Sequence, residues 1–167
     1  VPTFLEGALA TSPLVAGLAL AALTVGWPIG ASQAGRFYLR IGFKATALIG
    51  ISITVAGLLV LTLTAATPNV ALVALGCFVV GLGLGLVATP TLISAQSSVP
   101  WHERGVVTST NMFARSIGSA LGVAVFGAVA NAVYSGAPGG GSHGPAVVAA
   151  SGAVFLAALV AGLLTVA

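Results

Sequence analysis

The sequence predicts an all-α integral membrane protein, a polytopic transmembrane helical bundle. Two observations carry this prediction: the chain is nearly free of charge, and its apolar residues form long runs. Charged residues make up 4% of the 167 residues, against about 25% in a water-soluble domain. The mean hydropathy is +1.17. Such a chain cannot cover itself with a surface that water wets, so we expect most of its surface to contact lipid.

Five apolar segments are long enough, or nearly so, to cross the hydrocarbon core, for which a helix needs about 20 residues. They lie at residues 13–35, 45–65, 70–95, 106–134 and 145–167. Residues 1–10 are expected to be the end of a preceding span, in a fragment of a longer protein. The runs lack the alternating polar face of a membrane β-barrel. Helices are therefore predicted, because backbone groups in lipid must find hydrogen bonds within their own segment.

The basic residues fall in alternate connections between these segments. Residues 36–44 carry three of them and residues 97–105 carry Arg104, whereas residues 66–69 and 135–144 carry none. The positive-inside rule places the two basic connections at the cytoplasmic face, so the last span ends there. The bias toward Ala, Gly and Val, with little Lys, is typical of a bacterial gene rich in G and C. A multi-pass protein of the bacterial inner (plasma) membrane is thus expected.

Glycines recur four residues apart inside the apolar segments, so that each pair lies on one helix face. The pairs are Gly26 and Gly30, Gly81 and Gly85, and Gly118 and Gly122. Small residues at this spacing let two membrane helices approach closely. We therefore expect Gly81, Gly85, Gly118 and Gly122 to be helix-packing positions in a bundle.

One basic side chain is predicted deep inside a span. Arg115 lies about ten residues from the start of the fourth span, on the order of 15 Å at helical rise. Thr108, Asn111, Arg115, Gly118 and Gly122 follow spacings that place them on one face of the helix. Two interpretations stay open for Arg115. It either lines a substrate path, or it extends to the cytoplasmic headgroups or bonds to backbone carbonyls, since an intramembrane Arg is costly without one of these environments.

Further polar and aromatic side chains are weaker candidates. Gln33 and Gln96 lie near the predicted cytoplasmic ends of their spans, where they either contact a substrate or are solvated at the interface. Trp27 is in the middle of a span, and packing is favoured for it over stacking against a substrate.

Other classes of site are not supported by the sequence. The basic residues are too few to follow a nucleic-acid backbone. No cofactor site and no metal site are expected, because Cys77 is the only cysteine and His102 and His143 are predicted on opposite faces. No Asp or Glu lies well inside a span, so neither an enzyme site nor a proton relay is predicted within this chain.

Residues 35–44, Gly-Arg-Phe-Tyr-Leu-Arg-Ile-Gly-Phe-Lys, resemble the cytoplasmic loop motif of the major facilitator superfamily, G-x-x-x-D-R-x-G-R/K-R/K. The matching residues are Gly35, Arg40, Gly42 and Lys44. Leu39 stands at the place of the Asp, and Phe43 at that of a basic residue. The interaction made by that Asp is therefore not expected in this chain.

Other stretches are similar to the fourteen-span multidrug-resistance branch of that superfamily, the drug:proton antiporters. They are residues 2–6, 12–17, 81–87, 99–105 and 113–122. The resemblance implies the C-terminal half of the superfamily fold, which acts together with a missing N-terminal half of the same transporter. It also implies that the carboxylates for proton coupling lie in that missing half.

The activity implied by the resemblance is secondary active transport. It would be proton-coupled efflux of drugs or other small hydrophobic or cationic compounds by alternating access. The implied partners are the lipid bilayer, a small-molecule substrate and protons. Two alternatives stay open: a sugar or metabolite exporter of the same fold, and a non-transporting membrane scaffold subunit.

Overall fold

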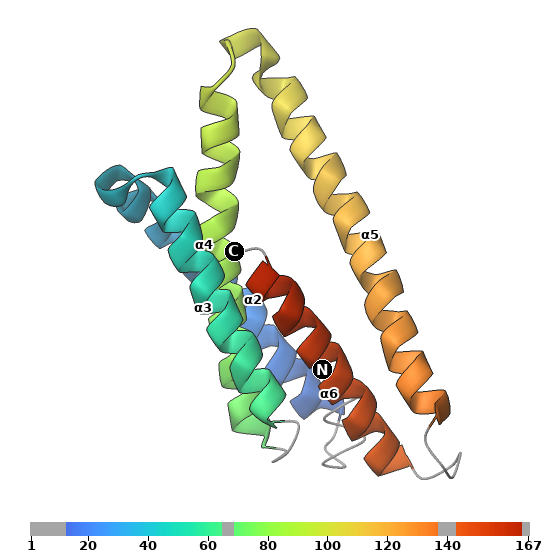
Figure 1. The fold of residues 1–167 in the computed structure, drawn as a ribbon. Coiled ribbons are helices and arrows are strands. Elements are labelled where there is room, and N and C mark those ends of the chain that lie inside the picture. Colours follow the sequence, from blue (N-terminus) through green and yellow to red (C-terminus); the bar gives the residue numbers. More distant parts are fainter. Residues whose placement is uncertain (1–12, 65–68, 137–142, 165–167) are drawn as a thin grey trace.

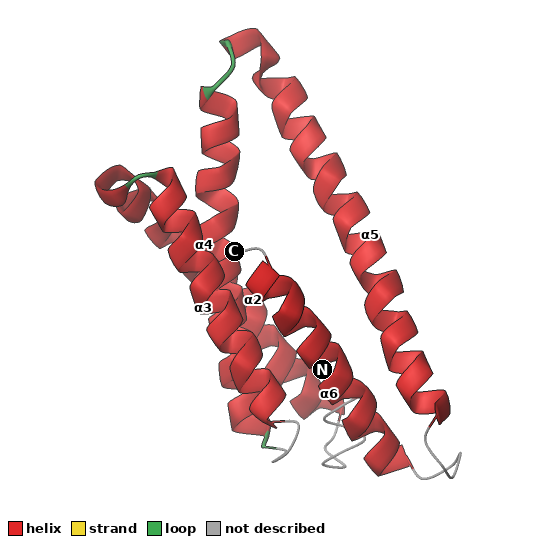
Figure 2. Ribbon diagram, viewed as in Figure 1, coloured by secondary structure: helices red, strands yellow, loops and turns green. Residues whose placement is uncertain are grey.

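The computed structural model describes residues 13–64, 69–136 and 143–164, and within these it consists of α-helices and one short 3-10 helix (Figures 1 and 2). The elements are α2 (Pro13–Ile41), α3 (Phe43–Thr64), α4 (Val70–Ser97), η1 (Trp101–Glu103), α5 (Arg104–Gly136) and α6 (His143–Leu164). None of the described residues forms a strand. The all-α prediction is confirmed. The expected end of a preceding span, at residues 1–10, lies outside the described residues.

Four of the described helical segments are long and apolar enough to cross a membrane. They are Leu14–Ile41, Phe43–Thr64, Val70–Ser97 and Trp101–Val133. Within α6, the apolar segment is shorter and covers Ala149–Gly162. The apolar runs of the sequence thus coincide with the helices, because backbone groups in lipid are satisfied most directly by bonds within the same segment.

The first basic connection is mostly helical, which corrects the expectation of a loop at residues 36–44. Helix α2 continues to Ile41 and α3 begins at Phe43, so that only Gly42 separates them. Gly42 has a φ of +87°, a left-handed conformation that costs an L-residue about 1–2 kcal/mol. Thr46 continues the helical bonding across the break, since both its amide and its hydroxyl donate to the Gly42 carbonyl. A single glycine therefore replaces the loop.

Helix α4 lies at the centre of the bundle, with α2 and α3 packed against it (Figure 1). A Cβ atom on Gly81 would lie 2.9 Å from the Leu23 carbonyl carbon, and one on Gly85 would lie 2.7 Å from the Ala31 amide nitrogen. Neither position has room for a larger residue, so the backbones of α2 and α4 are in direct contact at this face of α4.

The glycine pair on α5 has a different environment. A Cβ atom on Gly118 or Gly122 would meet no atom of another described residue within 4 Å. Helix α5 joins α4 at a tight turn and then diverges from it to pack beside α6 (Figure 1). Close packing at Gly118 and Gly122 therefore stays a prediction that concerns a partner outside the described residues.

A small apolar core joins α2, α3, α4 and α6. Its buried members are Ala16, Ala19, Leu61, Val73, Cys77, Val80 and Phe155. By contrast, large apolar side chains of α5 are exposed, among them Phe113, Leu121 and Val123, with exposed fractions of 67%, 62% and 72%. The hydrophobic effect stabilises α5 little in this chain, since its apolar surface is left for lipid or another part of a protein.

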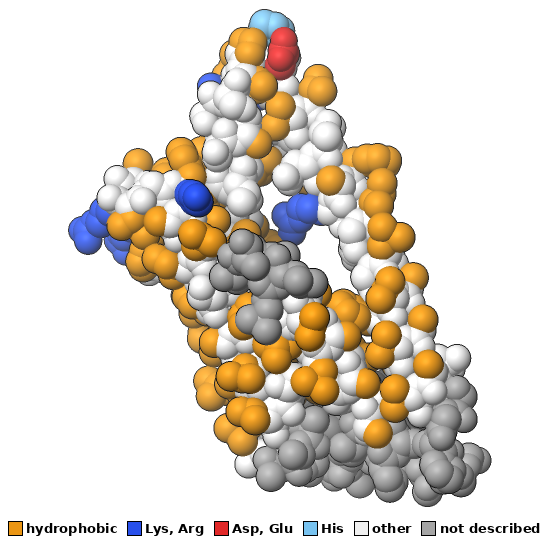
Figure 3. Space-filling view, in the orientation of Figure 1, with side chains coloured by type: hydrophobic (Ala, Val, Ile, Leu, Met, Phe, Trp, Pro, Cys, Tyr) orange, Lys and Arg blue, Asp and Glu red, His pale blue; other side chains and the backbone are white. Residues whose placement is uncertain are grey.

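The two basic connections lie at the same end of the bundle (Figures 1 and 3). The α2–α3 junction carries Arg40 and Lys44, and the α4–α5 turn carries Arg104. The described helix ends that flank the other two connections, at residues 66–69 and 135–144, lie at the opposite end (Figure 1). We refer to the end with Arg40, Lys44 and Arg104 as the basic end.

Candidate functional site

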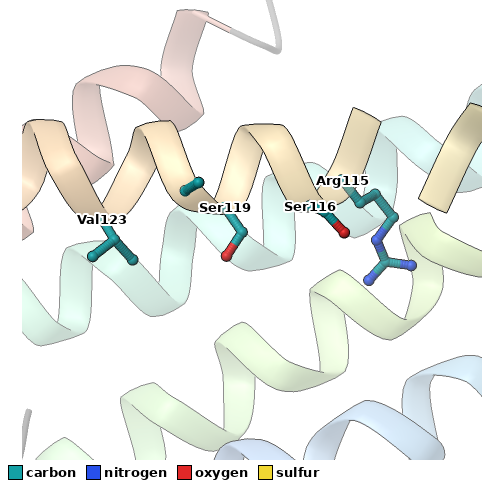
Figure 4. A pocket seen from close by; sticks show the side chains of 5 residues that line it. Arg115, Ser116, Ser119 and Val123 are labelled. Carbon is teal, nitrogen blue, oxygen red and sulfur yellow. The ribbon is translucent and has the colours of Figure 1, made fainter. Parts of the chain in front are cut away.

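Arg115 extends from α5 toward the neighbouring helices (Figure 4), and its guanidinium carbon lies 5.3 Å from the centre of the Trp27 ring of α2. A cation over an aromatic face at this distance is attracted by about 0.5–1 kcal/mol at exposed sites, and by more when it is desolvated. Trp27 lies fourteen residues before Ile41, or about 20 Å along α2 from the basic end. In this structure Arg115 is exposed within the described part of the chain, and its guanidinium contacts the Trp27 ring well away from the basic end.

A cavity of about 240 Å³ lies between α2, α4 and α5. It is lined by Trp27, Leu84, Val87, Ala88, Thr91, Asn111 and Arg115, and we call it the Arg115 cavity. Two of the five predicted substrate-path residues, Asn111 and Arg115, come together in it. The sequence favours packing for Trp27 and gives no separate indication for Thr91, yet both residues line this cavity.

Two further hollows adjoin the Arg115 cavity. The α5 hollow, about 750 Å³ and open, is lined by Arg115, Ser116, Ser119, Ala120 and Val123 (Figure 4). The Lys44 hollow, about 430 Å³, lies where α3 begins and α4 ends and is lined by Phe43, Lys44, Ala47, Pro90, Thr91, Ser94, Ala95 and Ser98. Arg115 and Thr91 each line two of the three spaces. The spaces therefore follow one another from the basic end to the middle of α5.

The other predicted substrate-path residues are engaged elsewhere. The Gln96 amide donates a hydrogen bond of 2.7 Å to the Thr108 hydroxyl, and this hydroxyl donates to the Arg104 carbonyl. Gln33 accepts a bond of 3.2 Å from the Arg36 guanidinium. Neither Gln33, Gln96 nor Thr108 lines the three spaces. Gln96 and Thr108 instead join α4 to α5 near the turn.

Positive charge dominates the three spaces. Lys44 and Arg115 are cationic, and no carboxylate lines any of the spaces. Glu103, the single acidic residue in the described part of the chain, lies in η1 with its Oε1 atom 3.5 Å from His102 Nε2. It is twelve residues from Arg115, or about 18 Å along α5. The described residues thus offer Arg115 no counter-ion.

Comparison with known proteins identifies the family. The sequence profile of the major facilitator superfamily matches residues 1–123, well over half of the chain. The chain belongs to the major facilitator superfamily. In this major facilitator chain, the loop-motif residues Gly35 and Arg40 lie in the last turns of α2, Gly42 forms the break, and Lys44 opens α3.

The relatives of this major facilitator chain include bacterial multidrug transporters. It is 31% identical to the multidrug transporter protein MdtP of Bacillus subtilis over 79% of this chain and 24% of MdtP. It is 32% identical to multidrug resistance protein 3 of the same organism, over 81% of this chain and 26% of that protein. It is 31% identical to multidrug resistance protein Stp of Mycobacterium tuberculosis, over 75% of this chain and 23% of Stp. The chain thus spans about a quarter of the length of these relatives.

Proposed function

We propose that this chain forms part of a secondary active transporter that exports drugs or other small, mostly hydrophobic compounds in exchange for protons. Alternating access would expose the Arg115 cavity to one side of the bacterial inner membrane and then to the other. The observation that carries the proposal is the Arg115 cavity itself: it brings Trp27, Asn111 and Arg115 from α2 and α5 to one place. The similarity to multidrug transporters supports the same conclusion.

The role of the cavity follows from its lining. Ligand sites combine an apolar surface with a few polar groups that fix orientation. Here Leu84, Val87 and Ala88 supply the apolar surface, and Asn111 and Arg115 supply the polar groups. A volume of about 240 Å³ is below the range of about 300–1,000 Å³ for complete small-molecule pockets. We therefore treat the cavity as one wall of a site that the rest of the transporter completes.

The remainder of the transporter would supply two things that the described residues lack. One is a carboxylate inside the membrane for proton coupling, because the described acid, Glu103, lies outside the cavity. The other is a partner for α5, whose Phe113 and Leu121 are exposed. The glycine pair Gly118 and Gly122 leaves room there for the backbone of another helix.

Transport by the full-length protein tests this proposal. Inside-out vesicles would be energised with a proton gradient, and a set of anionic, neutral and cationic dyes would be added while a pH-sensitive dye reports proton movement. We expect at least one dye to release protons from the vesicles and to accumulate in them, and an uncoupler to abolish its accumulation. If no dye of any charge moves protons, the chain belongs to something other than a proton-coupled exporter.

Variants connect the activity to the cavity. Trp27→Ala and Arg115→Ala should each lower the transport rate of a good substrate by about tenfold, the effect of losing roughly 1.4 kcal/mol of interaction. Leu63→Ala is the matched control, because Leu63 is 64% exposed on α3 and lines none of the three spaces. Wild-type rates in both cavity variants would show that the substrate path lies elsewhere.

A further inference from the structure

The charge of the lining points to a substrate class. We infer that this part of the transporter selects compounds in which a carboxylate or sulfonate is attached to an aromatic or apolar body. The inference rests on the proposed function and narrows it, because it favours anions over the cationic compounds that the family resemblance implies. Its basis is the succession of the Lys44 hollow, the Arg115 cavity and the α5 hollow, in which the ionisable side chains are Lys44 and Arg115.

The first step of the argument concerns the guanidinium of Arg115. Among the described residues, the guanidinium contacts the face of the Trp27 ring. The guanidinium forms neither an ion pair nor a hydrogen bond with any described side chain. Arg115 is exposed within the described part of the chain, so the Trp27 face covers only one side of its guanidinium and leaves the other donors accessible. An anion would do more, because a guanidinium donates two parallel hydrogen bonds to one carboxylate or sulfonate. Arg115 borders two of the spaces and can therefore meet such a group from either one.

The second step concerns hydrogen-bond donors. The Thr91 hydroxyl donates a hydrogen bond of 2.7 Å to the Val87 carbonyl, so its proton is already used. The amide of Asn111 and the ammonium of Lys44 have no such bond to another residue in the described part of the chain. The lining thus has unused donors at Asn111, Lys44 and Arg115, and donors are what an anionic oxygen needs. A cationic substrate would find no carboxylate here and would meet two like charges.

The third step concerns the body of the substrate. Beside Arg115 the cavity is bounded by the ring of Trp27 and by the apolar side chains Leu84 and Val87. Its volume of about 240 Å³ corresponds to roughly eight water molecules at about 30 Å³ each, enough for an aromatic ring and its substituent. An aromatic anion could therefore stack beside Trp27 while its acidic group reaches Arg115.

The fourth step concerns entry. Lys44 lies at the basic end, in a hollow that shares Thr91 with the Arg115 cavity. Hollows lined by one sign of charge raise the local concentration of the opposite charge. An anion that enters from the basic end would meet Lys44 first and Arg115 next, without passing a described carboxylate.

A matched pair of dyes tests the inference on the full-length transporter. Anilinonaphthalene sulfonate and phenylnaphthylamine have similar aromatic bodies and differ in the sulfonate, and ethidium is an aromatic cation. In energised inside-out vesicles we expect kcat/KM for the sulfonate to exceed the other two by about tenfold or more, as for a charge-assisted hydrogen bond. Arg115→Gln should remove this preference while phenylnaphthylamine is still transported, and Arg115→Lys should keep part of it.

Two variants complete the design. Lys44→Gln should lower kcat/KM for the sulfonate alone, without altering the Arg115 cavity, and it covers the case in which Arg115→Gln fails to fold. Arg36→Gln removes the same charge outside the three spaces and should leave the ratio of anion to neutral dye unchanged.

The outcomes separate the two proposals. Transport of ethidium or phenylnaphthylamine as fast as the sulfonate would overturn the anion preference and leave the exporter proposal standing. The anion preference would also be overturned if the Arg115→Gln variant is active and keeps the wild-type ratio of kcat/KM for the sulfonate to kcat/KM for the neutral dye. That result would indicate that a carboxylate from the rest of the transporter neutralises Arg115. Absence of transport and of proton movement with all three dyes would overturn both proposals.

Discussion

The side chains of Gln96 and Thr108 join α4 to α5 by a hydrogen bond of 2.7 Å between the Gln96 amide and the Thr108 hydroxyl. Only a short turn with η1 separates the two helices here, and α5 diverges from α4 beyond it (Figure 1). At the same turn, the guanidinium carbon of Arg104 lies 5.1 Å from the centre of the Trp101 ring. The bond therefore fixes the point from which the two helices separate around the Arg115 cavity.

The Gln96–Thr108 bond should contribute measurably to stability. We expect a coupling energy of about 0.6 kcal/mol, and at most about 1.7, the range found for side-chain bonds between membrane helices. A double-mutant cycle of Gln96→Leu and Thr108→Val in the full-length protein, followed by unfolding in a denaturing detergent, measures it. Ser97→Ala is the control, because the Ser97 hydroxyl bonds only to its own helix, at the Ser94 carbonyl. Strictly additive effects of the two substitutions would contradict the prediction.

Gly81 should not tolerate alanine. A Cβ atom there collides with the backbone of Leu23, which cannot move aside as a flexible side chain could. Overpacking of this kind costs about 1–3 kcal/mol, so Gly81→Ala should lower the thermal stability of the full-length protein and the amount recovered from membranes. Gly17→Ala is the matched control on α2, because a Cβ atom on Gly17 would meet no atom of another described residue within 4 Å. Equal stability of the two variants would mean that α2 and α4 are not in backbone contact.

Gly42 should be required for the junction between α2 and α3. Its φ of +87° makes Gly42→Ala destabilising by about 1–2 kcal/mol. Gly35→Ala serves as the comparison, since Gly35 lies inside α2 and a Cβ atom there would meet none of the other residues that the structure describes within 4 Å. Alanine at this position should stabilise the helix by up to about 1 kcal/mol. Thermal unfolding of the full-length protein should therefore show a lower melting temperature for Gly42→Ala and a higher one for Gly35→Ala. A stabilising Gly42→Ala would mean that the junction has another conformation.

The arrangement of helices was largely accessible from the sequence, whereas the composition of the cavity was not. Long apolar runs determine helices because lipid offers the backbone no other partners, and the spacing of Gly81 and Gly85 indicates one helix face. Neither pattern gives the rotation of α2 relative to α5. The contact between Trp27 and Arg115 depends on that rotation, so the sequence alone favours packing for the Trp27 ring.

Similar reasoning explains the remaining differences. Gln33 and Gln96 look alike in sequence, since both lie near the end of an apolar run. Gln33 accepts its bond from Arg36, three residues further along the same helix, whereas the bond from Gln96 reaches Thr108 on α5 and depends on how the fold places the two helices. The signal that could have pointed to Thr91 is its position next to Pro90, where the regular bonding of α4 is interrupted. The extension of α2 to Ile41 could have been expected from the absence of a helix-breaking residue between 36 and 41.

Trp27 should act on Arg115 through its aromatic face. A double-mutant cycle of Trp27→Leu and Arg115→Gln should give a coupling energy of about 0.5–2 kcal/mol, depending on how well the site excludes water. Trp27→Phe should keep a smaller part of it, because Phe also has a face but a weaker attraction for cations. Unfolding of the full-length protein provides the measurement. A coupling energy of zero would place the guanidinium away from the ring in the membrane.

The basic end should face the cytoplasm. A Ser98→Cys variant should react with a membrane-impermeant maleimide in inside-out vesicles and not in intact cells. An Asn69→Cys variant should react from the opposite side, because Asn69 precedes α4 at the other end and is exposed.

The Asn69 side chain caps α4 by accepting a hydrogen bond from the Ala71 amide. Loss of this cap costs about 1 kcal/mol and should leave the fold intact. Cys77 is 1% exposed and should give no background, provided that cysteines elsewhere in the full-length protein are replaced. Labelling of the Ser98→Cys variant in intact cells would contradict the positive-inside assignment. Labelling of both variants from the same side would mean that α4 does not cross the membrane.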